Sequence, residues 1–130
     1  MTQEEKQLLL KELCSRLPYG VLCYINDDDT STPRKLSRIE VDELDGVLLD
    51  FWTGREDCHF MQVYLSEVKP YLRPMSSMTD EEYAEYVRLV HEGYAHDTVD
   101  YLNSIHVDYR GLIQRGLAIK VTEENNSYKE

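Results

Sequence analysis

Three residues in the middle of the chain have types and spacing that suit a binding site. Lys69, Tyr71 and Arg73 alternate within residues 68–82, which read VKPYLRPMSSMTDEE. Two prolines of this segment hold it extended, because the proline ring fixes the backbone φ angle. Alternate side chains of an extended segment point to the same side, so two cations and a phenol would lie together. Such a set suits a carboxylate or an extended peptide as its ligand.

A structural interpretation of the same segment stays open. Val68, Leu72 and Met75, together with the tyrosine ring, would cover an open edge of a sheet. Arg73 would then pair with one of the 25 acidic residues of the chain, while its stem packs on apolar surface. The two interpretations differ in whether Lys69, Tyr71 and Arg73 line a cleft or pack against the sheet.

Metal-ligating residues occur without the spacing that a metal site needs. His91 and His96 flank Glu92 in HEGYAH, but the second histidine comes one residue later than in the zinc-protease H-E-x-x-H helix. A spacing of five residues separates side chains by about 140° around a helix, so one helical face cannot present both to one zinc ion. The aspartates at 27–29 lack the alternating ligands of a calcium loop. We therefore expect no metal site and no cofactor.

Nucleophile and acid–base candidates are equally unspecific. Cys58 and His59 are adjacent, and adjacent residues on a strand point to opposite faces, so a thiol nucleophile would need a histidine from elsewhere. A carboxylate pair for hydrolysis could come from the acids at Glu40, Asp42, Glu43, Asp45 and Asp50. With 25 acidic residues among 130, some pair of carboxylates will always resemble a catalytic pair by chance. No catalytic residue is predicted.

Charge narrows the class of partner. The formal net charge is −11, and the acidic excess is spread evenly over both halves of the sequence. A uniformly acidic surface repels the phosphates of DNA and RNA, so we expect no direct binding of nucleic acid. The same charge steers a basic protein partner toward the chain. A protein partner is therefore the expected one, and its identity and the oligomeric state stay open.

Composition predicts one folded domain over residues 1–130. A hydrophobic content of 42% with ten tyrosines argues against disorder, and a chain of this length buries a core without staples. Three cysteines without C-x-x-C spacing, and an N-terminus that lacks a basic region before an apolar one, predict a cytoplasmic protein. No apolar run is long enough to span a membrane, so no membrane partner is expected.

Helix signals open each half of the chain. Thr2 and Glu5 form a capping box, and leucines at every fourth position predict a helix that stops before Pro18. Thr79 and Glu82 repeat the box, and tyrosines and valines at helical spacing predict a helix that ends at a Gly93 C-cap. Asp97 is predicted to cap a third helix. These helices frame a first half that is rich in strand patterns.

Strand patterns fill the region between the first two helices. The predicted strands are residues 20–25, 36–41, 47–52 and 59–65, with a polar loop over 26–35 and a tight turn at Asp45 and Gly46. Residues 68–74 are expected to be an extended connection from sheet to helices. Residues 116–121 are expected to be a closing strand, and the polar tail over 122–130 to fray. The fold class is α+β: an N-terminal helix, an antiparallel meander of about four to five strands, and two helices in the C-terminal half.

Three motifs carry a resemblance: LPYGV at residues 17–21, VKPYLRPMSSMT at 68–79 and DYRGLI at 108–113. Together they resemble a family of small uncharacterised proteins encoded in phages and mobile elements of gut anaerobic bacteria. The second motif is long and specific, whereas residues 26–66 carry no motif of the family. The resemblance implies a bacterial or phage cytoplasmic protein with one compact domain. It implies no activity, cofactor or catalytic residue.

Two functions of different class remain. The first is a non-enzymatic interaction protein, an accessory or inhibitor factor of a mobile element, whose acidic and tyrosine-rich surface docks onto a protein. In one form of it, the acidic surface mimics DNA and fills a basic groove. The alternative is a small metal-dependent hydrolase or nuclease that uses Asp and Glu carboxylates. The absence of a catalytic constellation in the sequence favours the first and points away from an enzyme.

Overall fold

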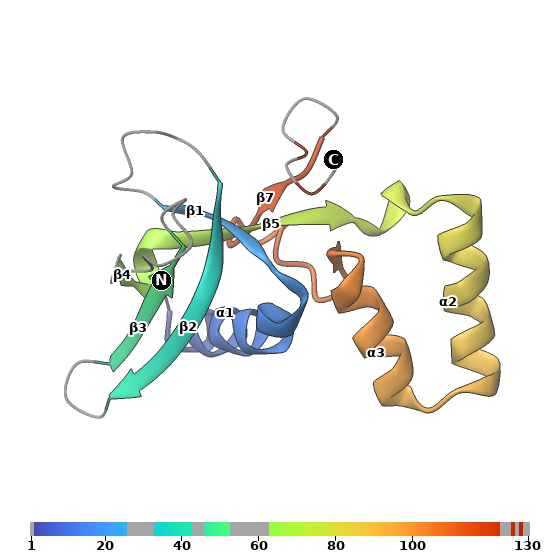
Figure 1. Ribbon diagram of the computed structural model, residues 1–130, viewed down its shortest axis with the longest axis horizontal. Coiled ribbons are helices and arrows are strands. Elements are labelled where there is room, and N and C mark those ends of the chain that lie inside the picture. The colour runs from blue at the N-terminus through green and yellow to red at the C-terminus, as the bar shows by residue number, and fades with distance from the viewer. Residues whose placement is uncertain are drawn as a thin grey trace.

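A mixed sheet, one helix against its face and a pair of helices beyond its end form the molecule (Figure 1). The computed structural model describes residues 2–25, 33–42, 46–52, 63–122, 126 and 128. In chain order the elements are α1 (Gln3–Arg16), η1 (Leu17–Tyr19), β1 (Leu22–Ile25), β2 (Arg34–Asp42), β3 (Gly46–Phe51), β4 (Val63–Tyr64), η2 (Leu65–Glu67), β5 (Val68–Pro74), η3 (Met75–Ser77), α2 (Asp80–Glu92), α3 (Ala95–Ser104), β6 (Val107–Asp108) and β7 (Ile119–Lys120), where η marks a 3-10 helix. The predicted α+β class is confirmed.

Helix α1 begins and ends as the sequence predicts. The Thr2 hydroxyl accepts the Glu5 N–H at 3.1 Å, and the Glu5 carboxylate accepts the Thr2 N–H at 2.9 Å. These reciprocal bonds satisfy two N–H groups that a helix start otherwise leaves open. Pro18 sits in the 3-10 turn η1, and Gly20 follows with φ of 71°, a left-handed value that glycine adopts readily.

The first four strands form the expected antiparallel meander. The sheet order is β4-β3-β2-β1-β5-β6, and β7 also pairs with β5. Strand β2 begins at Arg34, two residues before the predicted start, and pairs with β3 through positions such as Ile39 opposite Leu49. The predicted loop over 26–35, the turn at 45–46 and the strand over 59–65 fall partly or wholly outside the described residues.

Strand β5 departs from the expected connection. Residues 68–74 are extended, as their prolines require, but they form a central strand between β1 and β6. β5 pairs antiparallel with β1, where Cys23 lies opposite Pro70, and parallel with β6 and β7. The predicted closing strand is thus β7, a parallel neighbour of β5. Proline lacks the N–H that a ladder needs, which made this segment look like a link.

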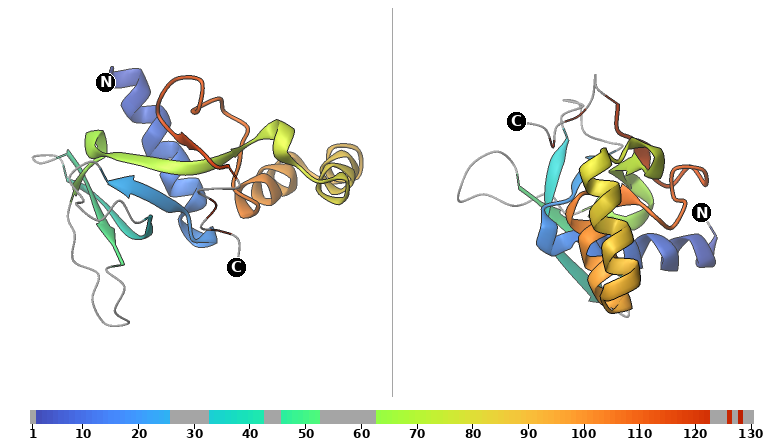
Figure 2. Two further views of the ribbon diagram at one scale, coloured as in Figure 1. Left: turned by 90° about the horizontal axis from the view of Figure 1, so that it is seen from above. Right: turned by 90° about the vertical axis from the view of Figure 1, so that its right-hand side faces the viewer.

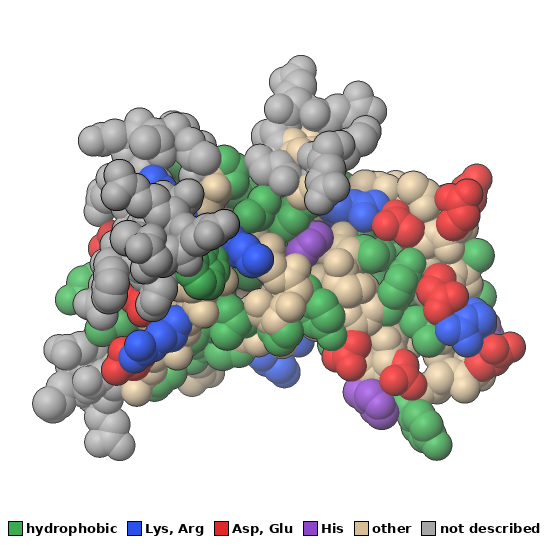
Figure 3. Space-filling model, in the orientation of Figure 1, with side chains coloured by type: hydrophobic (Ala, Val, Ile, Leu, Met, Phe, Trp, Pro, Cys, Tyr) green, Lys and Arg blue, Asp and Glu red, His purple; other side chains and the backbone are tan. Residues whose placement is uncertain are grey.

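Helices α2 and α3 form a hairpin that we call the arm, defined as residues 80–104. The arm extends away from the sheet, with α3 between α2 and the rest of the molecule, in both Figure 1 and the left view of Figure 2. We call that rest, α1 with the strands, the body. The Thr79 and Glu82 capping box is confirmed. On the face that Figure 3 shows, acidic side chains gather over the arm with apolar groups between them.

One prediction for the arm is confirmed and another is wrong. Gly93 is the C-cap of α2, as predicted, and its φ of −98° and ψ of −177° are extended. Helix α3 starts at Ala95, and its N-cap is Tyr94, three residues before the predicted cap at Asp97. Asp97 acts from the third helical position, where its carboxylate accepts the Tyr94 N–H at 3.1 Å. A carboxylate at that position reaches back as the glutamate of a capping box does.

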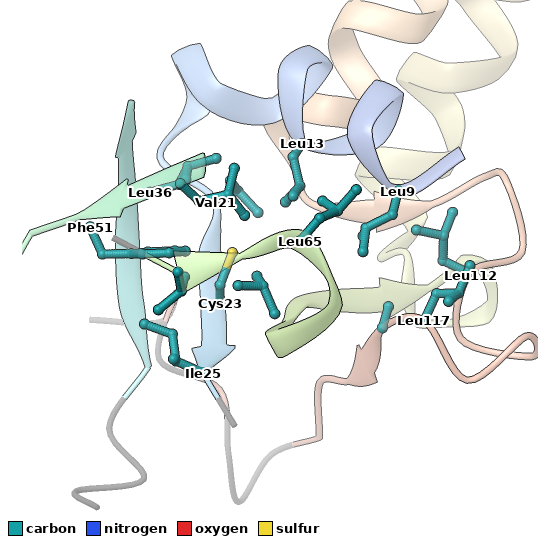
Figure 4. Packing of buried hydrophobic residues seen from close by; sticks show 14 of the residues in the cluster. Leu9, Leu13, Val21, Cys23, Ile25, Leu36, Phe51, Leu65, Leu112 and Leu117 are labelled. Carbon is teal, nitrogen blue, oxygen red and sulfur yellow. The ribbon is translucent and has the colours of Figure 1, made fainter. Parts of the chain in front are cut away.

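The core lies between α1 and the sheet. Figure 4 shows leucines of α1 directed at side chains from β1, β2, β3 and the segment around β7. Leu9 and Leu13 have no exposed surface, and Leu36, Phe51 and Leu72 are buried to 1% exposure or less. Burial of this kind stabilises a fold by about 1.5–3 kcal/mol per large apolar side chain. The body therefore holds most of the packed apolar surface of the described chain.

A buried ionic cluster joins α1 to the segment after α3. Glu12 and Arg16 are fully buried, and the Arg16 guanidinium donates to the Glu12 carboxylate and, at 2.5 Å, to the Val107 carbonyl oxygen. Arg110 donates to the second oxygen of Glu12 at 3.0 Å, and the ring of Tyr109 lies beside both guanidinium groups. A charge in such surroundings is tolerated only while it is paired, so the cluster fixes the segment that leads out of the arm.

Candidate functional site

The predicted trio lies on strand β5, where alternation places Lys69, Tyr71 and Arg73 on one side of the strand. Their surroundings differ. Lys69 is exposed, Tyr71 is 8% exposed, and the Arg73 side chain is 18% exposed. Burial is also the main reason why the pKa of Tyr71 lies above its usual value. The three therefore do not present equal access to a ligand.

Arg73 uses all of its donors within the chain. Its Nε–H donates to the Ser77 hydroxyl at 3.2 Å, and its Nη1 donates to a Glu82 oxygen at 2.9 Å and to the Ile105 carbonyl at 3.2 Å. Its Nη2 donates to the Ser77 carbonyl at 3.0 Å and to the second Glu82 oxygen at 2.7 Å. A guanidinium has five N–H donors, so none is left for a ligand. Arg73 ties β5 to the start of α2 and the end of α3.

Glu82 completes this connection, which we call the joint. Its carboxylate binds Arg73 through two oxygens and also accepts the Thr79 N–H at 2.9 Å. The hydrogen bond from Arg73 is the largest reason why the pKa of Glu82 falls from 4.5 to about 2. A two-point guanidinium–carboxylate pair fixes direction as well as distance. The joint therefore sets the angle at which the arm leaves the body.

The arm presents an unusual apolar surface. None of the thirteen residues of α2 is buried. Tyr83 is 57% exposed, Val90 is 52% exposed and Tyr94 is 75% exposed, which makes three of the six large apolar side chains that are exposed among the described residues. The stripe of tyrosines and valines, whose spacing predicted this helix, thus faces solvent and α3. An exposed apolar stripe on a regular helix is typical of an interaction surface.

Acidic residues surround this stripe. Residues 80–104 contain seven acidic residues and one basic residue, a net charge of −6 out of −11 for the chain. The one basic residue, Arg88, donates to Glu85 at 2.5 Å and lies 3.7 Å from Glu92. More than half of the net charge thus sits on 25 consecutive residues. The arm combines exposed aromatic surface with a strong negative field.

A small apolar pocket lies at the end of the arm, and we call it the tip pocket. It has a volume of about 330 Å³ and is lined by residues from the end of α2, the connection and the start of α3: Leu89, Val90, Gly93, Tyr94, Ala95, Thr98 and Val99. Beside it, the ring of Tyr94 stacks on His96 with centroids 5.7 Å apart. The tip pocket could accept one side chain of a partner.

A larger cleft of about 770 Å³ lies where the arm meets the body. His106 on its wall has φ of 63°, an uncommon value for a residue with a side chain, and its ring stacks on Tyr128 with centroids 3.7 Å apart. Burial is the main cause that lowers the pKa of His106 from 6.5 to about 4. The Tyr128 hydroxyl accepts the Leu22 N–H at 2.8 Å and donates to the Tyr71 carbonyl at 2.9 Å.

The hydrogen bonds of Tyr128 connect one wall of the cleft to the sheet. The β1–β5 ladder ends at Cys23 opposite Pro70, and proline has no N–H to continue it. The next pair, Leu22 and Tyr71, is bridged by the phenol of Tyr128. Within the tail that the sequence predicts to fray, this one side chain is held by the sheet. Tyr128 therefore ties the C-terminal tail to the sheet at one wall of the cleft.

The residues considered for metal and thiol chemistry are dispersed where they are described. His91 ends α2 and His96 starts α3, both exposed, and the described residues contain no group of three or more His, Cys, Asp and Glu side chains suited to a metal ion. Cys14 is exposed, whereas Cys23 is buried and its pKa is raised by burial. Cys58, His59 and the aspartates at 27–29 lie outside the described residues. Among residues 2–25, 33–42, 46–52 and 63–122, no helix has the length and apolar character to cross a membrane.

Comparisons with known proteins give no family or relative for this chain. A scan against protein-family models found no match, and searches of curated proteins and of solved structures found none either. The arm is the feature that sequence reasoning missed as a site. Residues 80–94 show an apolar stripe beside many acidic residues, but such a stripe on a helix usually faces a core, so by itself it does not indicate a binding site.

Proposed function

We propose that this chain is a non-enzymatic interaction protein whose arm docks onto a partner protein. One observation carries the proposal: α2 is a regular thirteen-residue helix with an apolar stripe, and it buries none of its side chains in the chain's own core. Full burial of a valine contributes roughly 1.5–3 kcal/mol, and the partly exposed side chains of α2 forgo a share of such burial free energy. A docked partner would recover part of that free energy.

Charge favours a basic partner. The arm has a net charge of −6 over residues 80–104, and complementary charge raises the rate of encounter and rejects acidic competitors. Tyrosine is enriched at the centre of protein interfaces because its ring gives apolar contact and its hydroxyl stays hydrogen-bonded. The exposed rings of Tyr83 and Tyr94 would therefore supply contact, and the surrounding carboxylates would supply orientation. A partner with exposed Lys and Arg around an apolar centre fits this surface.

The biological setting is part of the proposal. The motifs at residues 17–21, 68–79 and 108–113 resemble proteins of phages and mobile elements, which supports an accessory or inhibitor factor that acts in the cytoplasm. A small acidic protein of this kind would act by occupying a basic surface of another protein. The proposal requires no catalytic residue and no cofactor in this chain.

Site-specific cross-linking tests the proposal. A photoreactive phenylalanine replaces Tyr83, Tyr94 or, as a matched control, Tyr64 on β4, which is 54% exposed. Each variant is irradiated in nuclease-treated bacterial lysate at low and high salt, and adducts are identified by mass spectrometry. We expect one polypeptide to cross-link from positions 83 and 94 and not from 64, with less adduct at high salt. Identical adducts from all three positions, or no adduct from the arm, would contradict docking through the arm.

A further inference from the structure

The tip pocket has the dimensions of a socket for one side chain. Its volume of about 330 Å³ is at the lower end of the roughly 300–1,000 Å³ range of small-molecule pockets. Leu89, Val90 and Val99 give it apolar walls, and two lining residues, Tyr94 and Thr98, each carry a hydroxyl. A group of the size of an isolated indole or phenyl ring fits this space better than an extended ligand does.

The tip pocket is held in shape by the arm itself. Gly93 forms part of its lining, and a Cβ atom there would lie 3.0 Å from the Leu89 carbonyl oxygen and 3.4 Å from an Asp97 carboxylate oxygen. A side chain at position 93 would therefore crowd the Leu89 carbonyl oxygen. Asp97 also accepts the Tyr94 N–H at 3.1 Å, which fixes the start of α3. A preformed pocket loses less entropy on binding than one that must first assemble.

Charged groups lie close along the chain to this apolar space. Glu92 precedes Gly93, and Asp97 and Asp100 are on the first turns of α3. His96 pairs with Asp97 at 3.3 Å, and Arg88 is engaged by Glu85 and Glu92. Carboxylates on residues next to the pocket lining in the sequence favour an apolar side chain that has cations on either side. Buried aromatic anchors of this kind dominate the affinity of many interfaces.

We propose that the tip pocket takes one large apolar side chain of the partner, a Trp, Phe or Leu that is flanked by Lys or Arg. This inference rests on the proposed docking of the arm and names the residue type that docks. Tyr94, as the most exposed of the large apolar side chains in the described residues, would fold over the inserted group. The carboxylates would contact the flanking cations.

Two synthetic peptides test the inference with the full chain. Both are lysine-rich helical peptides of the same length and charge, and one has a central Trp where the other has Ala. Backbone amide shifts of the isotope-labelled protein are followed by NMR. We expect the Trp peptide to bind about tenfold more tightly or better, and to shift the amides of Gly93, Ala95 and Thr98 in a way that the Ala peptide does not.

Matched variants separate the tip pocket from the rest of the arm. Ala95→Leu places a larger side chain in the pocket lining, whereas Ala84→Leu makes the same change at an exposed site of α2 outside it. The advantage of the Trp peptide should vanish in A95L and persist in A84L, with unchanged helix content in both. Equal binding of the two peptides to the arm would overturn the socket and leave basic docking standing. No shift of arm amides with either peptide would count against the proposed function as well.

Discussion

Helices α1 and α2 make a matched pair within one molecule. They contain 14 and 13 residues, and each begins with a threonine cap whose hydroxyl and N–H are both bonded to a glutamate three residues on. Helix α1 nevertheless buries four side chains, and α2 buries none. Capping and periodicity thus determine where a helix forms. They do not determine what the helix packs against. The difference in burial between α1 and α2 distinguishes the body, which holds the core, from the arm, whose apolar side chains stay exposed.

The largest expected effect lies in the body, at the buried ionic cluster. Glu12→Ala would leave Arg16 buried without its carboxylate and take the partner from Arg110. Removing one partner of a buried pair costs about 3–5 kcal/mol. Glu81→Ala, an exposed position on α2, should change stability by no more than about 0.5 kcal/mol. Urea unfolding of both variants checks the pair, and a loss below about 1 kcal/mol for E12A would contradict the role of the cluster.

The next effect falls on the joint between the two regions. Arg73→Ala removes five hydrogen bonds, two of them to the Glu82 carboxylate, and a hydrogen bond to a charged group contributes about 1.5–3 kcal/mol. We expect the amides of α2 to exchange faster with solvent while those of β1 and β5 keep their protection. Hydrogen exchange with mass spectrometry measures both. Arg88→Ala, which removes exposed ion pairs on the arm, serves as the control and should raise the exchange of α2 amides much less than Arg73→Ala does.

Acid should act on the same joint in a defined range. Because Arg73 lowers the pKa of Glu82 to about 2 from 4.5, the folded state holds this carboxylate ionised more strongly than the unfolded state does. Its contribution is complete above pH 4.5 and is lost as the pH falls toward 2. The protection of α2 amides, which is the slowing of their exchange relative to the intrinsic rate at the same pH, should therefore fall in that range in the natural chain and be low throughout in Glu82→Gln. A natural chain whose α2 protection does not change with pH would argue against the joint.

These regions were predicted from the sequence to different extents. The start of α1, the start of α2 and the meander followed from local signals, because Thr2, Thr79 and the alternating apolar residues act within a few positions of themselves. Strand β5 was predicted to be a connection because Pro70 and Pro74 lack the N–H that strand pairing uses. Its pairing with β6 and β7 depends on residues 107–120, far along the chain. Arg73 was predicted to be a binding residue. Its five hydrogen-bond acceptors come from η3, α2 and the end of α3, and no local sequence pattern predicts that these segments meet around it.

A smaller effect is expected where the tail meets the sheet. Tyr128→Phe removes the hydroxyl that bridges the Leu22 N–H and the Tyr71 carbonyl. Two backbone groups would lose their partner, at a cost of about 1–3 kcal/mol. Tyr83→Phe, on the exposed face of α2, should be close to neutral. Thermal unfolding monitored by circular dichroism compares the two variants, and equal midpoints would place Tyr128 outside the stabilising contacts of the body.

His106 gives the body a pH dependence in a different range. Its folded-state pKa of about 4 lies below the value of 6.5 for a free histidine, so the unfolded state binds a proton first as the pH falls. Stability should therefore decrease between pH 6.5 and 4, on the order of 1 kcal/mol at pH 5 after allowance for partial exposure. Asparagine tolerates the left-handed backbone of this position, so His106→Asn should remove the dependence. Unfolding curves at pH 7 and pH 5 measure it.

The smallest effect on stability is expected on the arm. A small effect there would separate the arm from the body most clearly. Val90→Ala removes a side chain that is 52% exposed, and Val68→Ala makes the same change at 1% exposure in β5. Burial of a valine contributes about 1.5–3 kcal/mol, so V68A should lose a large part of that, whereas V90A should stay within about 0.5 kcal/mol, helped by the higher helix propensity of alanine. Cross-linking from position 83 should nevertheless weaken in V90A and persist in V68A at temperatures where V68A is folded. A V90A variant that unfolds as readily as V68A would mean that the arm belongs to the core after all.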